Sequence, residues 1–146
     1  MITKEVKMMF ETTIDVRYYE TDMQKIVHHS NYLRWFEIVR TKLLESLGVT
    51  MTDIENEGVF YVMKEARLDY IKPVKYGEKV TLCAKLTTYN GIRLVHEYQV
   101  KVNDEIRCTG QTTLATIKQS TMLPANLKKI SPKIHQIILD SVEIDQ

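Results

Sequence analysis

Apolar and polar residues alternate along most of this chain, which is the pattern of β-strands that bury one face. The alternation is loose over residues 8–19, where one face carries Phe10, Thr12, Ile14, Val16 and Tyr18. It is more regular over residues 59–71, 79–88, 92–102 and 105–118. His96 lies on the apolar face of the most regular of these segments, where a hydrogen-bonded core histidine is expected. The sequence therefore predicts a sheet of about five strands.

Short turns connect the later strands and make them antiparallel neighbours. Pro73 and Gly77 end the strand of residues 59–71. Asn90-Gly91 predicts a short hairpin with a type I′ turn, because both residues accept positive φ. A second turn is expected at Asn103-Asp104.

Residues 31–47 have the periodicity of a helix rather than of a strand. At 100° per residue, eight large apolar side chains fall within one half of the helical wheel. They are Tyr32, Leu33, Trp35, Phe36, Val39, Leu43, Leu44 and Leu47. Ser30 or Asn31 can cap the start of this helix, and Gly48 suits its end because glycine tolerates positive φ. A helix with so wide an apolar face is expected at the centre of the core.

The remaining elements are short. A polar helical turn is expected at residues 51–57, and a helical tail at about residues 124–146. Ser131-Pro132 is a typical helix start for this tail, which would bury Ile134, Ile137 and Ile138. The order of elements predicts an α+β fold over residues 1–146, a single domain in which a curled antiparallel sheet embraces one long helix.

Composition narrows the function classes. Of the 146 residues 44% are apolar and 27% are charged, which is ordinary for one globular domain. The formal charge of +1 gives no electrostatic reason to expect nucleic acid or an anionic membrane surface as a partner. The two cysteines are too few for a disulfide framework. No segment resembles a signal peptide or a membrane span, so a cytoplasmic protein is expected.

The candidate chemistry lies between the first strand and the long helix. The sequence lacks the G-x-S-x-G, P-loop, dinucleotide-binding and H-E-x-x-H motifs, so those enzyme classes have no support. Instead, Glu20, Asp22, His28 and His29 fall within ten residues before the helix. The N–H groups of a helix start can polarise a carbonyl, and a carboxylate such as that of Asp22 can activate water or attack a thioester.

These residues resemble the hot-dog-fold acyl-CoA thioesterases of the 4-hydroxybenzoyl-CoA thioesterase type, which include short bacterial acyl-CoA thioester hydrolases. The matching residues are Tyr19, Thr21-Asp22, Val27, His29, Asn31-Tyr32, Phe36-Glu37 and Arg40. The turn of residues 70–78 is also similar to the family's proline-containing connection. Met23-Gln24-Lys25 departs from the family, which often has a small or glycine-containing segment there.

The resemblance implies a hot-dog fold and an acyl-CoA thioester hydrolase that releases CoA and a carboxylic acid. Asp22 matches the family's catalytic aspartate, and the backbone N–H of His29 matches the donor to the thioester carbonyl. Substrate contacts are expected from Met23, Val27, Asn31 and Tyr32. No metal and no cofactor is implied, since CoA belongs to the substrate. A homodimer or homotetramer with active sites between subunits is expected.

Each candidate residue also has a plainer interpretation. Asp22 could be a turn or capping aspartate, and His29 could simply lie near a helix cap. Glu37 and Arg40 could form a half-buried pair at i, i+3. A rival branch of the family places its catalytic carboxylate on the long helix, which would make Glu37 the candidate.

Other functions stay open as well. The thioester could be carried by acyl carrier protein rather than by CoA. The chain could also be a non-catalytic hot-dog module that binds acyl-CoA or acyl carrier protein, or a dehydratase-type enzyme that acts on 3-hydroxyacyl-CoA.

Overall fold

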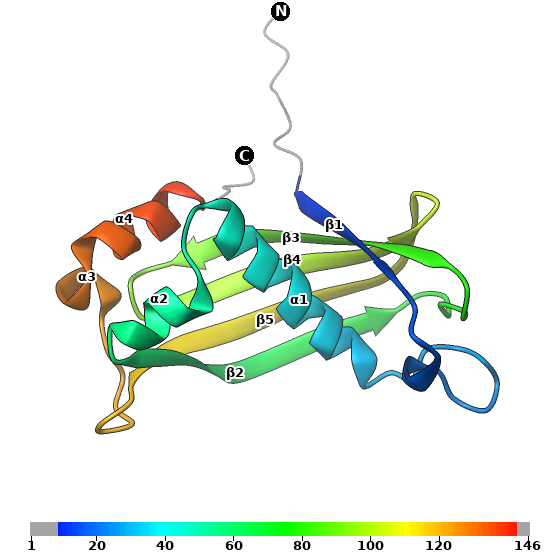
Figure 1. Ribbon diagram of the computed structural model, residues 1–146, viewed down its shortest axis with the longest axis horizontal. Coiled ribbons are helices and arrows are strands. Elements are labelled where there is room, and N and C mark those ends of the chain that lie inside the picture. Colours follow the sequence, from blue (N-terminus) through cyan, green and yellow to red (C-terminus); the bar gives the residue numbers. More distant parts are fainter. Residues whose placement is uncertain (1–8, 143–146) are drawn as a thin grey trace, which may run out of the picture.

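The chain forms an antiparallel sheet that curls around one long helix, as the computed structural model of residues 9–142 shows (Figure 1). The strands are β1 (Phe10–Asp15), β2 (Val59–Tyr70), β3 (Lys79–Tyr89), β4 (Arg93–Val102) and β5 (Glu105–Lys118). The helices are α1 (Asn31–Ser46), α2 (Met51–Asn56), α3 (Leu127–Ile130) and α4 (Pro132–Asp140), with a 3-10 turn at Tyr18–Glu20. This is the predicted α+β arrangement, a hot-dog fold in which five strands embrace α1.

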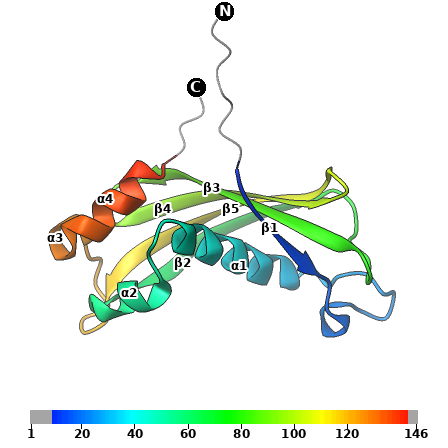
Figure 2. The same ribbon diagram turned by 45° about the horizontal axis from the view of Figure 1, so that its top comes forward.

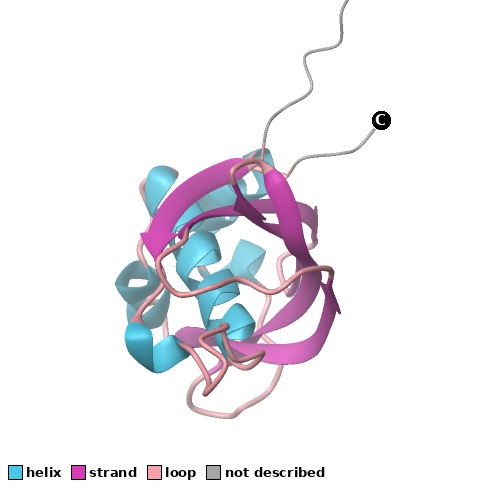
Figure 3. Ribbon diagram, turned by 90° about the vertical axis from the view of Figure 1, so that its right-hand side faces the viewer, coloured by secondary structure: helices cyan, strands magenta, loops and turns pink. Residues whose placement is uncertain are grey.

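The sheet has the order β1-β3-β4-β5-β2, so β1 and β2 form its two edges. Seen end on, the strands curve around α1 without closing into a barrel (Figure 3). The turned view of Figure 2 shows α3 and α4 beyond the far end of α1, away from the loop that follows β1. None of the described helices is both long and apolar enough to cross a membrane.

Helix α1 supplies the centre of the core, as its apolar face predicts. Trp35, Phe36 and Val39 are fully buried, and the Phe36 ring stacks on Tyr98 with centroids 4.2 Å apart. Gly110 of β5 leaves the space that the Phe36 ring occupies. Leu33 is the exception among the predicted core positions, because it is 38% exposed.

The helix ends differ in how well they match expectation. Gly48 follows α1 with a φ of +88°, which confirms the expected glycine at the helix end. The capping prediction is wrong for Ser30. It occupies the N-cap position, but its hydroxyl lies 2.8 Å from Nδ1 of His28 and makes no cap hydrogen bond.

The strands follow their alternation, and the exceptions have local causes. The first strand ends at Asp15, earlier than predicted, because the chain turns into the 3-10 segment at Tyr18–Glu20. The type I′ turn predicted at Asn90-Gly91 is wrong. The Asn90 side chain accepts the N–H groups of Ile92 and Arg93 and holds a longer loop. Positive φ at two successive non-glycine residues occurs instead at Asn103-Asp104.

The end of the described chain packs into a second core cluster formed mainly by β3, β4 and β5, to which α1 contributes Leu44. The Ser131 hydroxyl accepts the Ile134 N–H and starts α4, as predicted, and Ile138 is buried. The predicted helical tail begins with the short helix α3 and is interrupted at Ser131, where α4 starts. Residue 8 of the predicted first strand and residues 143–146 of the predicted tail lie outside the described residues.

Candidate active site

The segment between β1 and α1 is a small hairpin held on both sides. Within it, the Asp22 N–H donates to the Ile26 carbonyl and the His28 N–H to the Glu20 carbonyl. Its outer side is attached to the loop after β2, where the Val27 N–H donates to the Val74 carbonyl at 2.8 Å. A segment without long regular structure is thereby fixed at the start of α1.

Glu20 is the buried anchor of this hairpin. Its carboxylate accepts the indole N–H of Trp35 at 2.6 Å and the backbone N–H of Arg17 at 2.7 Å. Its backbone carbonyl also accepts the side-chain amide of Asn31 at 2.8 Å. The hairpin is therefore attached to the first two turns of α1.

Asp22 lies near the tip of the hairpin and is exposed in the isolated chain. One carboxylate oxygen accepts the Gln24 N–H at 2.8 Å, which is the turn role that aspartate often has. Within residues 9–142, no hydrogen-bond donor occupies its second oxygen. The carboxylate thus stabilises the turn and keeps one oxygen available for chemistry.

His29 follows the hairpin directly and precedes α1. Its carbonyl accepts the Tyr70 hydroxyl at 3.4 Å, while its own N–H donates to no group of the described chain. The rings of His28 and His29 lie against each other with centroids 4.1 Å apart. The available N–H lies at the positive end of the α1 dipole, where a carbonyl oxygen would be stabilised.

The four residues predicted to contact substrate have different surroundings. Met23 is fully exposed, whereas Val27, Asn31 and Tyr32 are buried. Asn31 donates to two loop carbonyls, and burial raises the pKa of Tyr32 to about 12, with a smaller contribution from Cys108. In the isolated chain these three residues hold the junction together, and their contact with substrate stays a prediction.

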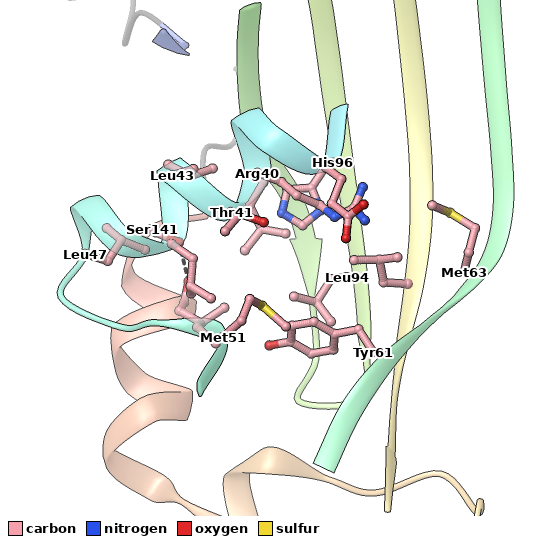
Figure 4. Close-up of a pocket in the computed structure, with 15 residues that line it drawn as sticks. Arg40, Thr41, Leu43, Leu47, Met51, Tyr61, Met63, Leu94, His96 and Ser141 are labelled. Atoms are coloured by element: carbon pink, nitrogen blue, oxygen red, sulfur yellow. Dashed lines mark hydrogen bonds between the residues drawn. The ribbon is translucent and has the colours of Figure 1, made fainter. Parts of the chain in front are cut away.

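A cavity of about 280 Å³ lies beside the second half of α1, between this helix, the inner face of the sheet and α4 (Figure 4). Its apolar wall includes Leu43, Leu44, Leu47, Leu86, Leu94 and Leu114. Met51 and Met63 also line it, together with the polar or charged side chains of Glu37, Arg40, Tyr61 and His96. The cavity combines a predominantly apolar wall with a few polar groups, which is typical of small-molecule sites.

Two polar atoms in this wall were not identified from the sequence as a candidate site. Nδ1 of His96 and the hydroxyl of Tyr61 are buried and have no hydrogen-bond partner, so the expectation that His96 is hydrogen-bonded fails at Nδ1. Burial, together with the nearby Arg40 guanidinium, lowers the pKa of His96 to about 3. The imidazole is therefore neutral at ordinary pH.

The two charged residues of α1 that line the cavity, Glu37 and Arg40, do not form the expected ion pair. Arg40 is half-buried, and its guanidinium lies 3.5 Å from the Tyr98 hydroxyl. Glu37 is exposed. Figure 4 shows Arg40 next to His96 at one end of the cavity, with Met51 and Tyr61 toward the other end.

Comparisons with known proteins agree with this architecture. The sequence profile of the thioesterase-like superfamily matches residues 16–137. YneP of Bacillus subtilis, provisionally named an acyl-CoA thioesterase, is 32% identical over 123 residues, which are 84% of this chain and 89% of YneP. Acyl-CoA thioesterase YbgC of Haemophilus influenzae is 24% identical over 130 residues, which are 88% of this chain and 96% of YbgC. The DHNA-CoA thioesterase structure from Staphylococcus aureus has a TM-score of 0.85 at 31% identity and covers 89% of this chain and 88% of its own.

Proposed function

Because the chain belongs to the thioesterase-like superfamily, we propose that it hydrolyses acyl-CoA thioesters at the junction between the hairpin and α1. One observation carries this proposal: the exposed carboxylate of Asp22 and the unpaired N–H of His29 lie on the same short segment. Together they provide a base or nucleophile and a donor to the thioester carbonyl. The overall reaction adds water to the thioester and releases CoA and a carboxylic acid.

In the general-base route, Asp22 removes a proton from water while the water oxygen attacks the thioester carbonyl carbon. The carbonyl oxygen, on which negative charge develops, accepts a hydrogen bond from the His29 N–H. When the tetrahedral intermediate collapses, the carbon–sulfur bond breaks and the thiolate of CoA recovers the proton from Asp22. In the alternative route, the Asp22 carboxylate attacks the carbonyl carbon, the carbon–sulfur bond breaks, and the thiolate of CoA leaves as a mixed anhydride forms. Water then hydrolyses the anhydride, which restores the Asp22 carboxylate and releases the carboxylic acid, and the proton set free in this step goes to the CoA thiolate.

Thiol release from a panel of acyl-CoA thioesters tests the proposal. We expect the parent protein to release CoA, and Asp22→Asn to reduce kcat by about 10²- to 10⁴-fold, the usual contribution of a general base or acid. Asparagine can still accept the Gln24 N–H, so the turn at this position should survive the change. Equal and negligible release by both proteins would favour the non-catalytic binding module. Hydration of an enoyl-CoA without thiol release would favour the dehydratase.

Glu37 is the second carboxylate to test. It is exposed near the cavity on α1, which is where the rival branch of the family carries its catalytic carboxylate. If Asp22 is the base, Glu37→Gln retains far more activity than Asp22→Asn. The reverse order would move the catalytic role to α1.

The proposed active unit is a homodimer formed along β2. Support comes from the position of β2 at the edge of the sheet, with Met63 and Tyr70 exposed on it. A two-fold axis near the middle of β2 would place the start of one β2 beside the end of the other. Because Tyr61 and Met63 line the cavity and Tyr70 contacts His29, this dimer would bring the cavity of one subunit to the junction of its partner.

A further inference from the structure

We infer that Arg107 is a positioning residue for the reaction and that it holds Asp22 in place through the β2–β3 loop, residues 71–78. The inference rests on the proposed thioesterase function, because it gives a residue outside the junction a role in the same reaction. Arg107 lies on β5, and its side chain donates hydrogen bonds to this loop and to Glu105.

The β2–β3 loop is the outer support of the hairpin. Its Val74 carbonyl accepts the Val27 N–H at 2.8 Å, and its Tyr76 N–H donates to the Lys25 carbonyl at 3.0 Å. An antiparallel bridge between the two segments lies between these bonds. All three contacts are made by the arm of the hairpin that follows Asp22. A displacement of the loop is therefore passed through the backbone to the Asp22 carboxylate.

Arg107 attaches this loop to β5 at its start, its middle and its end. Its backbone carbonyl accepts the N–H groups of Ile71 and Lys72 at 2.9 and 3.1 Å. Nη1 of its guanidinium donates to the Pro73 carbonyl at 2.7 Å. Nη1 and Nη2 also donate to the two carboxylate oxygens of Glu78, at 3.3 and 3.2 Å. One residue thus fixes the course of the loop that supports the hairpin.

These side-chain contacts need the geometry of a guanidinium. Its donors point in fixed directions from one plane, whereas the ammonium group of lysine is a compact point charge. The side chains of Arg107 and Glu78 are only 15% and 24% exposed, so their ion pair is better shielded from water than an ordinary surface pair. Glu105 accepts the Nε–H at 2.6 Å, so every nitrogen of the guanidinium has a partner.

The expected effect of Arg107 is on the rate of the chemical step. A misplacement of about 1 Å, even when it arises far from the chemistry, can lower a rate by about 10²-fold. The acyl cavity lies beside the second half of α1, away from the hairpin at its start, so substrate binding should change less. A direct contact between Arg107 and a CoA phosphate would have the opposite signature, a higher KM at unchanged kcat.

Arg107→Met and Lys72→Met form a matched pair of variants. Both remove a cation bonded to Glu105, but the Arg107 side chain also holds the loop. With the acyl-CoA that the parent hydrolyses fastest, assayed well below the melting temperature, we expect Arg107→Met to lower kcat by about 10- to 100-fold with little change in KM. Lys72→Met should keep the kcat of the parent. Arg107→Lys keeps the charge without the planar fork and should recover only part of the lost kcat.

Hydrogen exchange of backbone amides tests the support of the hairpin without turnover. The Val27 and Tyr76 N–H groups connect hairpin and loop, so we expect them to exchange at least about tenfold faster in Arg107→Met, as the loss of charge-assisted bonds predicts. Lys72→Met should leave both rates unchanged. The N–H of Val39, a buried residue of α1, is the internal reference for the stability of the whole domain.

Several results would overturn the inference. They are an unchanged kcat in Arg107→Met, a rise in KM without a fall in kcat, and full activity of Arg107→Lys, which carries the same test if Arg107→Met does not fold. Acceleration of Val39 as large as that of Val27 also overturns it, because it marks a general loss of stability. A parent that hydrolyses no thioester overturns the proposed function, whereas the exchange rates still measure whether Arg107 supports the hairpin.

Discussion

The indole N–H of Trp35 donates a 2.6 Å hydrogen bond to the carboxylate of Glu20, and both side chains are buried. Trp35 belongs to α1, while Glu20 belongs to the hairpin that carries Asp22. The same carboxylate also accepts the Arg17 N–H, so two backbone or side-chain donors compensate for its burial. The position of the candidate base Asp22 therefore depends on the buried carboxylate of Glu20, which has no proposed role in the reaction itself.

This relationship predicts that Trp35→Phe is strongly destabilising. The change removes one of the two hydrogen bonds to a buried carboxylate, and bonds to charged groups contribute about 1.5–3 kcal/mol. With the lost ring volume, we expect the free energy of unfolding to fall by roughly 2–4 kcal/mol in urea denaturation. Glu20→Gln should lower the free energy of unfolding less in the Trp35→Phe background than in the parent, because the hydrogen bond between the two side chains is already absent there. Strict additivity of the two changes would contradict the proposed coupling.

Lys25 gives a second prediction, at the tip of the hairpin. Its φ is +63°, a conformation that disfavours residues with a side chain, and its carbonyl accepts the Tyr76 N–H at 3.0 Å. We expect Lys25→Gly to be more stable than Lys25→Ala by about 1 kcal/mol, because only glycine adopts this region freely. Thermal unfolding of the two variants measures the difference. A Lys25→Ala protein as stable as Lys25→Gly would show that the hairpin relaxes to another conformation.

The dimer proposal gives a third prediction. Ala66 is exposed in the middle of β2, near the proposed two-fold axis, so Ala66→Glu would bring two negative charges together across the interface. We expect the dissociation constant of the dimer to rise at least about tenfold, measured by sedimentation. Thr88→Glu adds the same charge on β3, away from this edge, and should keep the parent's oligomeric state. Equal behaviour of the two variants would place the interface elsewhere.

The core elements were predictable because their signals are local. The eight apolar side chains of residues 31–47 define one helical face, and the alternation through β3 and β4 leaves little choice of which side is buried. The type I′ turn predicted at Asn90-Gly91 is wrong because Gly91 has a positive φ but Asn90 does not, and the Asn90 side chain accepts the N–H groups of Ile92 and Arg93. The tolerance of asparagine and glycine for positive φ does not reveal which hydrogen bonds the Asn90 side chain will make.

The candidate site was only partly predictable. Asp22 and His29 are close in the sequence, so their chemistry could be identified before the fold was known. The cavity brings together Arg40, Tyr61 and His96 from a helix and two strands, and no periodicity shows that two of their polar atoms lack partners. Glu20 was noticed as one of several polar residues, but its bond to Trp35 depends on how the hairpin folds back on α1.

The buried imidazole of His96 predicts a pH dependence of stability. Burial lowers the pKa of His96 in the folded chain from 6.5 to about 3, so below pH 6.5 the unfolded chain binds a proton that the folded chain does not. The contribution that the uncharged His96 makes to the free energy of unfolding is therefore fully present above pH 6.5, and it is lost as the pH falls from 6.5 toward 3. Each pH unit in this window corresponds to about 1.4 kcal/mol at most, so we expect the parent to lose roughly 2 kcal/mol between pH 6.5 and pH 4.5 relative to His96→Gln. Urea denaturation of both proteins across this range removes the contributions they share. Parallel stability curves would mean that the folded chain accepts the proton as readily as the unfolded chain, and that His96 is not held neutral in the cavity.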